Sequence, residues 1–422
     1  MKGTSMRPRI PLLMATVTAV TAVLVPGQAA AAPAAHTTVD TVPAVENLLD
    51  PLLIDLARAE LSPADQARLD AITAHLPANW QERLAQVRSE FDIESSGVEE
   101  VVAAAIDPSQ YECQPTAFSN YANALLDGVD LGTLLILVLL GVLDFPTYDA
   151  LLYGKPGNAE DYGLPAAYKG PVTQAVKQSQ KFWDVDLFDV KTLAMQNDML
   201  ADHARMTRVI GVLFGTDEAD AAETATLIMD VIASSPPLEG GANPIFTLNA
   251  FAFSAEGETD PIFQGIPDKM VFGEGMATAL DVLGVGTTGA KAVVGHEMAH
   301  HVQYEQGYFD SPLTGPEATR RTELMADAFG TYFVAHPRGL KMNAVQIHQA
   351  EQSFYQVGDC SFTSAGHHGT PNQRLKASVW GAELARAAVS PYPVLASDAI
   401  FAKFEKKLPN FVKPDARNRP AA

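Results

Sequence analysis

The stretch VVGHEMAHHVQYEQG, residues 293–307, combines residue types that can bind a metal ion. His296 and His300 are four residues apart, so on a helix their imidazoles project from one face and can share an ion. Glu297 lies about 100° further round the helix, beside such an ion rather than on it. This HExxH spacing predicts two zinc ligands and a carboxylate that takes a proton from water. A pattern this short also arises by chance, so a third ligand is required.

The next helical stretch, TRRTELMADAFGTYF at residues 319–333, supplies a third ligand. Glu323 and Asp327 are again four residues apart on one helix face. We predict that Glu323 completes the zinc site and that Asp327 accepts a hydrogen bond from the outer nitrogen of a zinc histidine. The alternative is a solvated acidic face that pairs with the neighbouring arginines.

A site with three histidines, HExxHxxGxxH, is excluded because Gln303 and Gln306 occupy the later positions. His301 points well away from His296 around the helix, so we assign it a structural role.

These residues require two long helices and a few strands to position them. The metal-binding helix is predicted to start near Gly286 and to end at Gly307. Aromatic and β-branched residues predict a strand at 245–254, and a second short strand within 268–280 turns helical. Residues 188–214 are predicted to be one helix. The fold class is α+β and mostly helical, with a small mixed or antiparallel sheet over the HExxH helix.

The N-terminus has the pattern of a secretory signal peptide at residues 1–32. Basic residues precede an apolar run over 10–25, and a small-residue stretch follows it, with cleavage predicted near Ala32. An uncleaved anchor is the alternative. Residues 33–112 are predicted to form an N-terminal helical region or a pro-segment, residues 113–405 the catalytic domain, and residues 406–422 a tail.

Composition and charge exclude some partners. The chain has 422 residues, of which 47% are hydrophobic, and a formal net charge of −21, which argues against nucleic acid or an anionic membrane as a partner. The apolar run at 131–143 is too short for a bilayer, which needs roughly 20 residues, so it is predicted to be a buried helix. We therefore expect no stable membrane span once the signal is removed.

The two cysteines, Cys113 and Cys360, are predicted to form a disulfide in an oxidising compartment. Two separate buried thiols are one alternative. A precursor in which Cys113 caps the metal is another.

The motifs HEMAHH and ELMAD resemble the gluzincin class of zinc peptidases, in which a glutamate is the third ligand. NAFAFS, residues 249–254, resembles the strand before the active-site helix of the prenyl-protein and heat-shock membrane metalloproteases. HHVQ, ELMADAFG and HHGTPNQR resemble the predicted neutral zinc metallopeptidases of bacteria. The resemblance covers residues 245 to 380, and the first 240 residues show no such resemblance. The membrane group carries several transmembrane helices, whereas none is readable in this sequence beyond the signal.

The resemblance implies a zincin-like catalytic domain with one catalytic Zn²⁺ and with Glu297 as the general base. By similarity, His368 and Arg374 contact substrate or transition state, with His367 as the alternative to His368. Arg374 paired with a carboxylate in a loop is the alternative for that residue.

The strand residues Asn249, Ala250 and Phe251 are expected either to pair with extended substrate or to form a core strand.

The function predicted from these features is secreted zinc-dependent endopeptidase activity on a protein or peptide substrate. A catalytically silent protein that keeps its zinc is one alternative, and a zinc hydrolase of a non-peptide amide is the other. The sequence predicts neither the natural substrate nor the oligomeric state.

Overall fold

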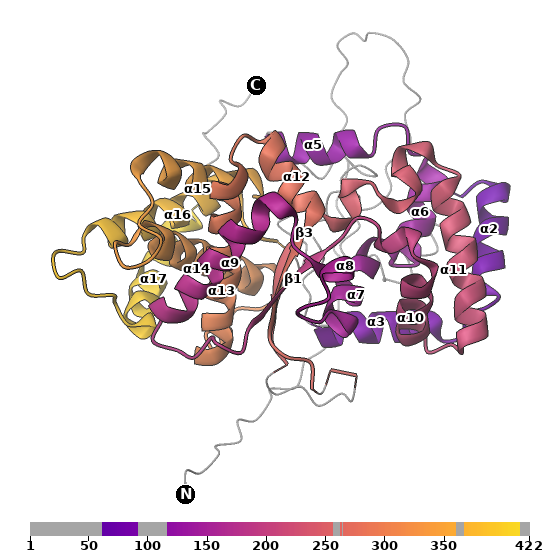
Figure 1. Ribbon diagram of the computed structural model, residues 1–422, viewed down its shortest axis with the longest axis horizontal. Coiled ribbons are helices and arrows are strands. Elements are labelled where there is room, and N and C mark those ends of the chain that lie inside the picture. The colour runs from indigo at the N-terminus through magenta and orange to yellow at the C-terminus, as the bar shows by residue number, and fades with distance from the viewer. Residues whose placement is uncertain (1–60, 92–115, 256–261, 264, 360–366, 414–422) are drawn as a thin grey trace, which may run out of the picture. The chain divides into compact units, whose positions relative to one another are not determined.

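A three-stranded mixed sheet lies between two groups of helices in the computed structural model, which describes residues 61–91, 116–255, 262–263, 265–359 and 367–413 (Figure 1). β1 (Lys191–Met195) pairs in parallel with β3 (Lys269–Gly273), and β2 (Ala250–Phe253) pairs antiparallel with the other side of β3. All of β3 is buried, whereas the first three residues of β2 are only half-buried. In the described part of the chain, β2 is therefore an edge strand.

The two faces of the sheet are covered by different helices. Val271 of β3 packs against α7 (Phe145–Tyr153) and α8 (Ala159–Tyr162). On the opposite face, Phe272 stacks on Tyr168 of α9 (Ala166–Phe182), with ring centroids 6.1 Å apart. Neighbouring strand residues point to opposite faces of a sheet, so the packing of Val271 and Phe272 shows that β3 is buried on both faces. A strand buried on both faces needs no alternation of polar and apolar residues, and β3 shows none.

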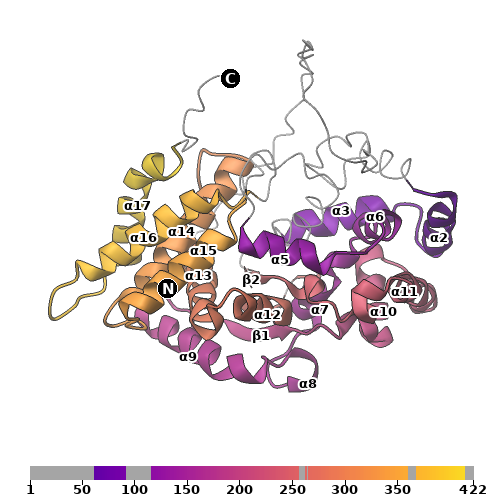
Figure 2. The same ribbon diagram turned by 90° about the horizontal axis from the view of Figure 1, so that it is seen from above.

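One group of helices comes mainly from the first half of the chain (Figures 1 and 2). α2 begins with the predicted cap: the Ser62 hydroxyl accepts the Asp65 N–H, and Pro63 is the first helical residue. Buried residues of α2 and α3 belong to the same hydrophobic core as the later helices. The helices of this group are α2 (Pro63–Thr73), α3 (Trp80–Phe91), α5 (Ala117–Leu125), α6 (Leu131–Leu139), α10 (His203–Phe214) and α11 (Glu218–Ala233).

The apolar run at 131–143 is buried, but it is not one helix. α6 ends at Leu139, and Gly141 has a φ of 65°, a left-handed conformation that breaks the helix before the short 3₁₀ turn η2 (Val142–Asp144). Among the described helices, no single one is long and apolar enough to cross a membrane. The helical segments 131–139 and 142–153 are long and apolar enough only if they are counted together, and they meet at a bend of 69°.

The second group of helices carries the metal-binding motifs. α9 belongs to this group because it packs against α13, and both views place the helices of the group together (Figures 1 and 2). The others are α12 (Glu274–Val282), α13 (Gly286–Gln306), α14 (Pro316–Ala335), α15 (Ala344–Gln356), α16 (Pro371–Arg386) and α17 (Ser397–Phe411). The predicted fold class, mostly helical α+β with a small sheet, is confirmed.

Two element predictions need correction. The helix predicted over 188–214 is wrong in its first part, because residues 191–195 form β1 and only 203–214 are α-helical. The strand predicted over 245–254 is shorter, because the 3₁₀ turn η5 (Pro244–Thr247) occupies its start. In β1, pairing with β3 outweighs the helix propensity of Lys, Leu, Ala and Met.

Some predictions fall outside the described residues. These are the signal peptide, the domain boundary near residue 112, and the cysteines Cys113 and Cys360. At the other end, α17 continues through the boundary predicted between residues 405 and 406.

Candidate metal centre

α13 carries both histidines of the motif and is buried along most of its length. The helix ends at Gly307, whose φ of 66° provides the left-handed C-cap predicted from the sequence. His301, on a different face, is fully buried, and its Nε2 lies 3.0 Å from the main-chain oxygen of Lys269 in β3. α13 is therefore fixed to the sheet through His301, while His296 and His300 face α14.

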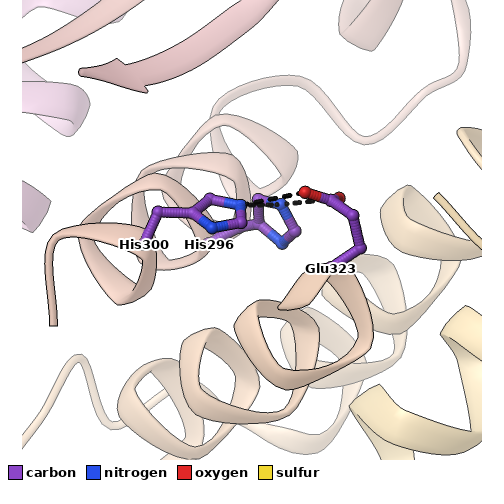
Figure 3. Close-up of side chains that lie close together, drawn as sticks. All are labelled: His296, His300 and Glu323. Atoms are coloured by element: carbon purple, nitrogen blue, oxygen red, sulfur yellow. Dashed lines mark hydrogen bonds and ion pairs between the residues drawn. The ribbon is translucent and has the colours of Figure 1, made fainter. Parts of the chain in front are cut away.

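α14 brings the third predicted ligand to the same place. Figure 3 shows the Glu323 carboxylate directed at both imidazoles. One Glu323 oxygen lies 3.2 Å from His296 Nε2 and the other 3.1 Å from His300 Nε2, while the two Nε2 atoms are 3.1 Å apart. All three side chains are nearly buried. The structure thus brings together the His-His-Glu group that the sequence predicts, as a group able to hold a metal ion.

The donor set and its spacing fit zinc. Zinc–nitrogen and zinc–oxygen bonds of about 2.1 Å in a tetrahedron place neighbouring ligand atoms about 3.4 Å apart. The two Nε2 atoms are 3.1 Å apart, and each lies 3.1–3.2 Å from a different oxygen of the Glu323 carboxylate, which is close to that value. Among the residues that the structure describes, two imidazoles and one carboxylate form this group, which leaves one corner of a tetrahedron open, as in catalytic zinc sites.

Within this group, His296 and Glu323 shift each other's pKa values. Burial disfavours a charged imidazole, yet the facing carboxylates of Glu323 and Asp327 raise the pKa of His296 to about 10. Burial likewise opposes ionisation of Glu323, but His296 and its neighbours hold the pKa of that carboxyl well below its usual range. The Glu323 carboxylate is therefore charged, as a metal ligand must be.

Asp327 lies behind His296, where the sequence predicts an outer partner. Its Oδ1 is 2.9 Å from His296 Nδ1, in an ion-pair contact that is not aligned as a straight hydrogen bond. Asp327 is fully buried and is held in turn by Arg374 of α16, whose Nε and Nη2 donate to the two carboxylate oxygens at 2.9 and 2.8 Å. The Arg374 guanidinium also lies 3.4 Å from Glu323. Arg374 thus contacts the carboxylates of the site, and its side chain is only 4% exposed.

Glu297, the predicted base, is nearly buried next to this group. Burial raises the pKa of its carboxyl, with His296 and His300 acting in the opposite direction. In the part of the chain that the structure describes, no group donates a hydrogen bond to its carboxylate. Among the described residues, no hydrogen bond therefore holds the Glu297 carboxylate in a structural role.

His367 and His368 lie just before α16 and both contact Asp359. The Asp359 carboxylate is 2.6 Å from His367 Nδ1 and accepts the His368 main-chain N–H at 2.7 Å. The Asp359 N–H donates to the Gly369 carbonyl at 3.0 Å. His367 is fully buried, whereas the His368 side chain is 20% exposed. Of the two histidines, His368 is the one that solvent reaches.

The sequence interpretation missed Gln303, which it used only to exclude a third histidine. Its Oε1 lies 3.1 Å from His300 Nδ1, and its Nε2 donates to the Thr322 carbonyl at 2.9 Å. The available signal was its position one turn after His300 on the same helix face.

The predicted substrate-strand residues lie at the start of the edge strand. Asn249 precedes β2, and its Oδ1 accepts the Ala250 N–H at 2.9 Å. Phe251 directs its side chain to the cluster on the α7 side of the sheet.

Comparisons with known proteins do not add to this picture: no family model matches the chain, and neither the curated proteins nor the solved structures contain a match.

Proposed function

We propose that the protein is a zinc-dependent endopeptidase. The observation that carries this proposal is the convergence of His296, His300 and Glu323 within 4.8 Å of one another, with Glu297 adjacent on the same helix. A site that only stabilised the fold would use four protein ligands. Three ligands among the described residues, with a buried carboxylate beside them, support hydrolysis instead.

In this proposal His296 and His300 bind the ion through Nε2, and Glu323 binds it through a carboxylate oxygen. When bound, zinc polarises a substrate carbonyl and lowers the pKa of water towards about 7. Glu297 would take a proton from the attacking water on its carboxylate, so that the water oxygen can bond to the carbonyl carbon. It would return this proton to the amine nitrogen as the peptide C–N bond breaks. Its burial and raised pKa suit a group that must both accept and release a proton near neutral pH.

The edge strand β2 supports binding of an extended peptide. The Gly273 N–H donates to the Asn249 carbonyl at 2.9 Å, which makes these two residues a hydrogen-bonded pair of the antiparallel ladder. Because such pairs alternate, Phe251 also bonds to β3, whereas Ala250 and Ala252 direct their main-chain groups away from it. We propose that Ala252, and the carbonyl of Ala250, pair with substrate.

His368 and Arg374 receive different roles. His368 is partly exposed and is held by Asp359 through its main-chain N–H, which supports a contact with substrate or transition state. Arg374 is buried against Asp327, so we propose that it positions Asp327, and through it His296.

We also propose that the protein is exported and acts on a protein or peptide. The N-terminal sequence pattern supports export.

The test combines a metal count with one substitution. The purified protein should contain one zinc ion per chain and cleave an unfolded casein-like protein, with loss of cleavage on chelation. Glu297→Gln should keep the zinc and lower turnover about 10²- to 10⁴-fold. Glu305→Gln, at an exposed position of the same helix, is the matched control and should leave turnover unchanged.

Two outcomes would overturn the proposal. A protein that binds one zinc ion but cleaves no protein substrate would be a silent zinc protein or a hydrolase of other amides, which a screen of amide substrates separates. Full turnover by Glu297→Gln would exclude Glu297 as the base.

A further inference from the structure

Gln303 lies one turn after His300 on α13 and is fully buried. Its amide contacts two groups of different character: the main-chain oxygen of Thr322 at 2.9 Å and the Nδ1 of His300 at 3.1 Å. A carbonyl oxygen can only accept hydrogen bonds, so the NH₂ side of the amide must face Thr322. The amide oxygen then faces His300, and the orientation of the amide is fixed.

This orientation determines the protonation of the His300 ring. Since the amide oxygen can only accept, the ring nitrogen that faces it, Nδ1, must carry a proton. In the neutral ring, Nε2 then has a free lone pair, and Nε2 is the atom that lies 3.1 Å from Glu323. We propose that Gln303 is a positioning residue that fixes the tautomer and ring orientation of His300 for metal binding.

The group that orients Gln303 belongs to α14. Thr322 directly precedes Glu323, so one amide connects the His300 ring to the main chain at the third ligand. A carbonyl oxygen has two lone pairs, and Thr322 can therefore accept from Gln303 as well as from its own helix. Gln303 thereby couples the placement of a ligand on α13 to the helix that carries the carboxylate ligand.

The two histidines are thus held in different ways. Asp327, a charged group paired with Arg374, lies behind His296, whereas a neutral amide lies behind His300. Outer partners of metal-bound histidines typically change metal affinity 10- to 100-fold when removed. This inference rests on the metal site of the proposed function but not on the reaction.

Two substitutions separate a positioning role from a clamp between helices. Gln303→Met removes both hydrogen bonds, whereas Gln303→Glu keeps an acceptor for His300 and loses the donor to Thr322. Positioning predicts that Gln303→Met lowers zinc affinity about 10- to 100-fold, measured by competition with a chromogenic chelator, and that Gln303→Glu stays close to wild type. Gln306→Met, on the same helix with its amide donating to Ser397, is the matched control and should not change affinity.

The tautomer can be read without zinc. In the metal-free full-length protein, ¹⁵N NMR should show His300 protonated at Nδ1 in the wild type and in Gln303→Glu, because both keep an acceptor that faces this nitrogen. Gln303→Met should lose this preference, and thermal melts should show that all variants fold.

Two results would overturn the inference: wild-type affinity in Gln303→Met, or an equal loss in both Gln303 variants. A wild type that binds no zinc would overturn both the inference and the proposed function. A wild type that binds zinc but cleaves no protein would overturn the proposed function alone, and the two failures can be distinguished.

Discussion

Gly295 of α13 and Gly330 of α14 lie against each other where the two helices cross. A Cβ atom added to Gly330 would lie 2.8 Å from the Gly295 carbonyl carbon and 2.8 Å from the His296 main-chain nitrogen. Two turns before Gly330 on α14 is Glu323, so this close approach sets how far the carboxylate ligand lies from the imidazoles. The distance between the helices is therefore part of the geometry of the metal site.

Gly330→Ala should separate α13 from α14 and weaken zinc binding. The backbone contact leaves no flexible side chain to move aside, and overpacking of this kind costs typically about 1–3 kcal/mol of stability. We expect lower zinc affinity in chelator competition and a lower urea midpoint in the metal-free protein. Gly211→Ala on α10, where the new Cβ would make only ordinary contacts beyond 3.4 Å, is the control. It should leave zinc affinity unchanged, and equal zinc affinity in the two variants would contradict the argument.

Arg374→Met should destabilise the fold, because it leaves the Asp327 carboxylate buried without its bidentate partner. Removal of one partner of a buried ion pair costs about 3–5 kcal/mol. Urea unfolding of the metal-free protein at pH 7 measures this effect apart from catalysis. A variant with wild-type stability but impaired turnover would instead support direct contact between Arg374 and substrate.

Because of Lys269, the free energy of unfolding should change with pH in the alkaline range. It is a buried cation whose Nζ donates to the carbonyls of Ala150, Leu151 and Gly154 at the end of α7. Burial lowers its pKa to about 8, although Asp149 acts in the opposite direction. The unfolded chain, with a lysine pKa near 10.5, therefore binds more protons between pH 8 and 10.5, and the free energy of unfolding rises with pH in that window.

The measurement compares the wild type with Lys269→Met in urea at pH 8 and pH 10. The variant loses the donor to three carbonyls and should be less stable at both values. The stability difference should grow with pH by at most about 1.4 kcal/mol per unit. A difference that shrinks as the pH rises would show that the pKa of Lys269 is not lowered by folding.

The group able to hold a metal ion could be predicted because its geometry is local. His296 and His300 share a helix face by spacing alone, and Glu323 and Asp327 repeat that spacing on the next helix. The partner of Arg374 could not be predicted, since it depends on how α16 packs against α14. Gln303 was missed for the same reason: its role appears only once the Thr322 carbonyl fixes its amide.

The strand β1 shows where sequence patterns fail for the fold. Residues 191–195 have no alternation of polar and apolar side chains, and only their pairing with β3 makes them a strand. By contrast, the end of α13 was predictable, because a helix commonly ends at a residue in the left-handed conformation and Gly307 adopts it readily.

The edge of β2 gives a matched pair of proline substitutions. Ala252 directs its N–H away from β3, so Ala252→Pro should keep the sheet and remove one main-chain donor for substrate. Loss of one hydrogen bond of about 0.5–1.5 kcal/mol predicts a KM for an extended peptide that rises roughly two- to tenfold. Phe251→Pro, one residue earlier, removes an N–H that bonds to β3 and should lower the urea midpoint instead. If Ala252→Pro folds normally and its KM is that of the wild type, substrate does not pair with this edge.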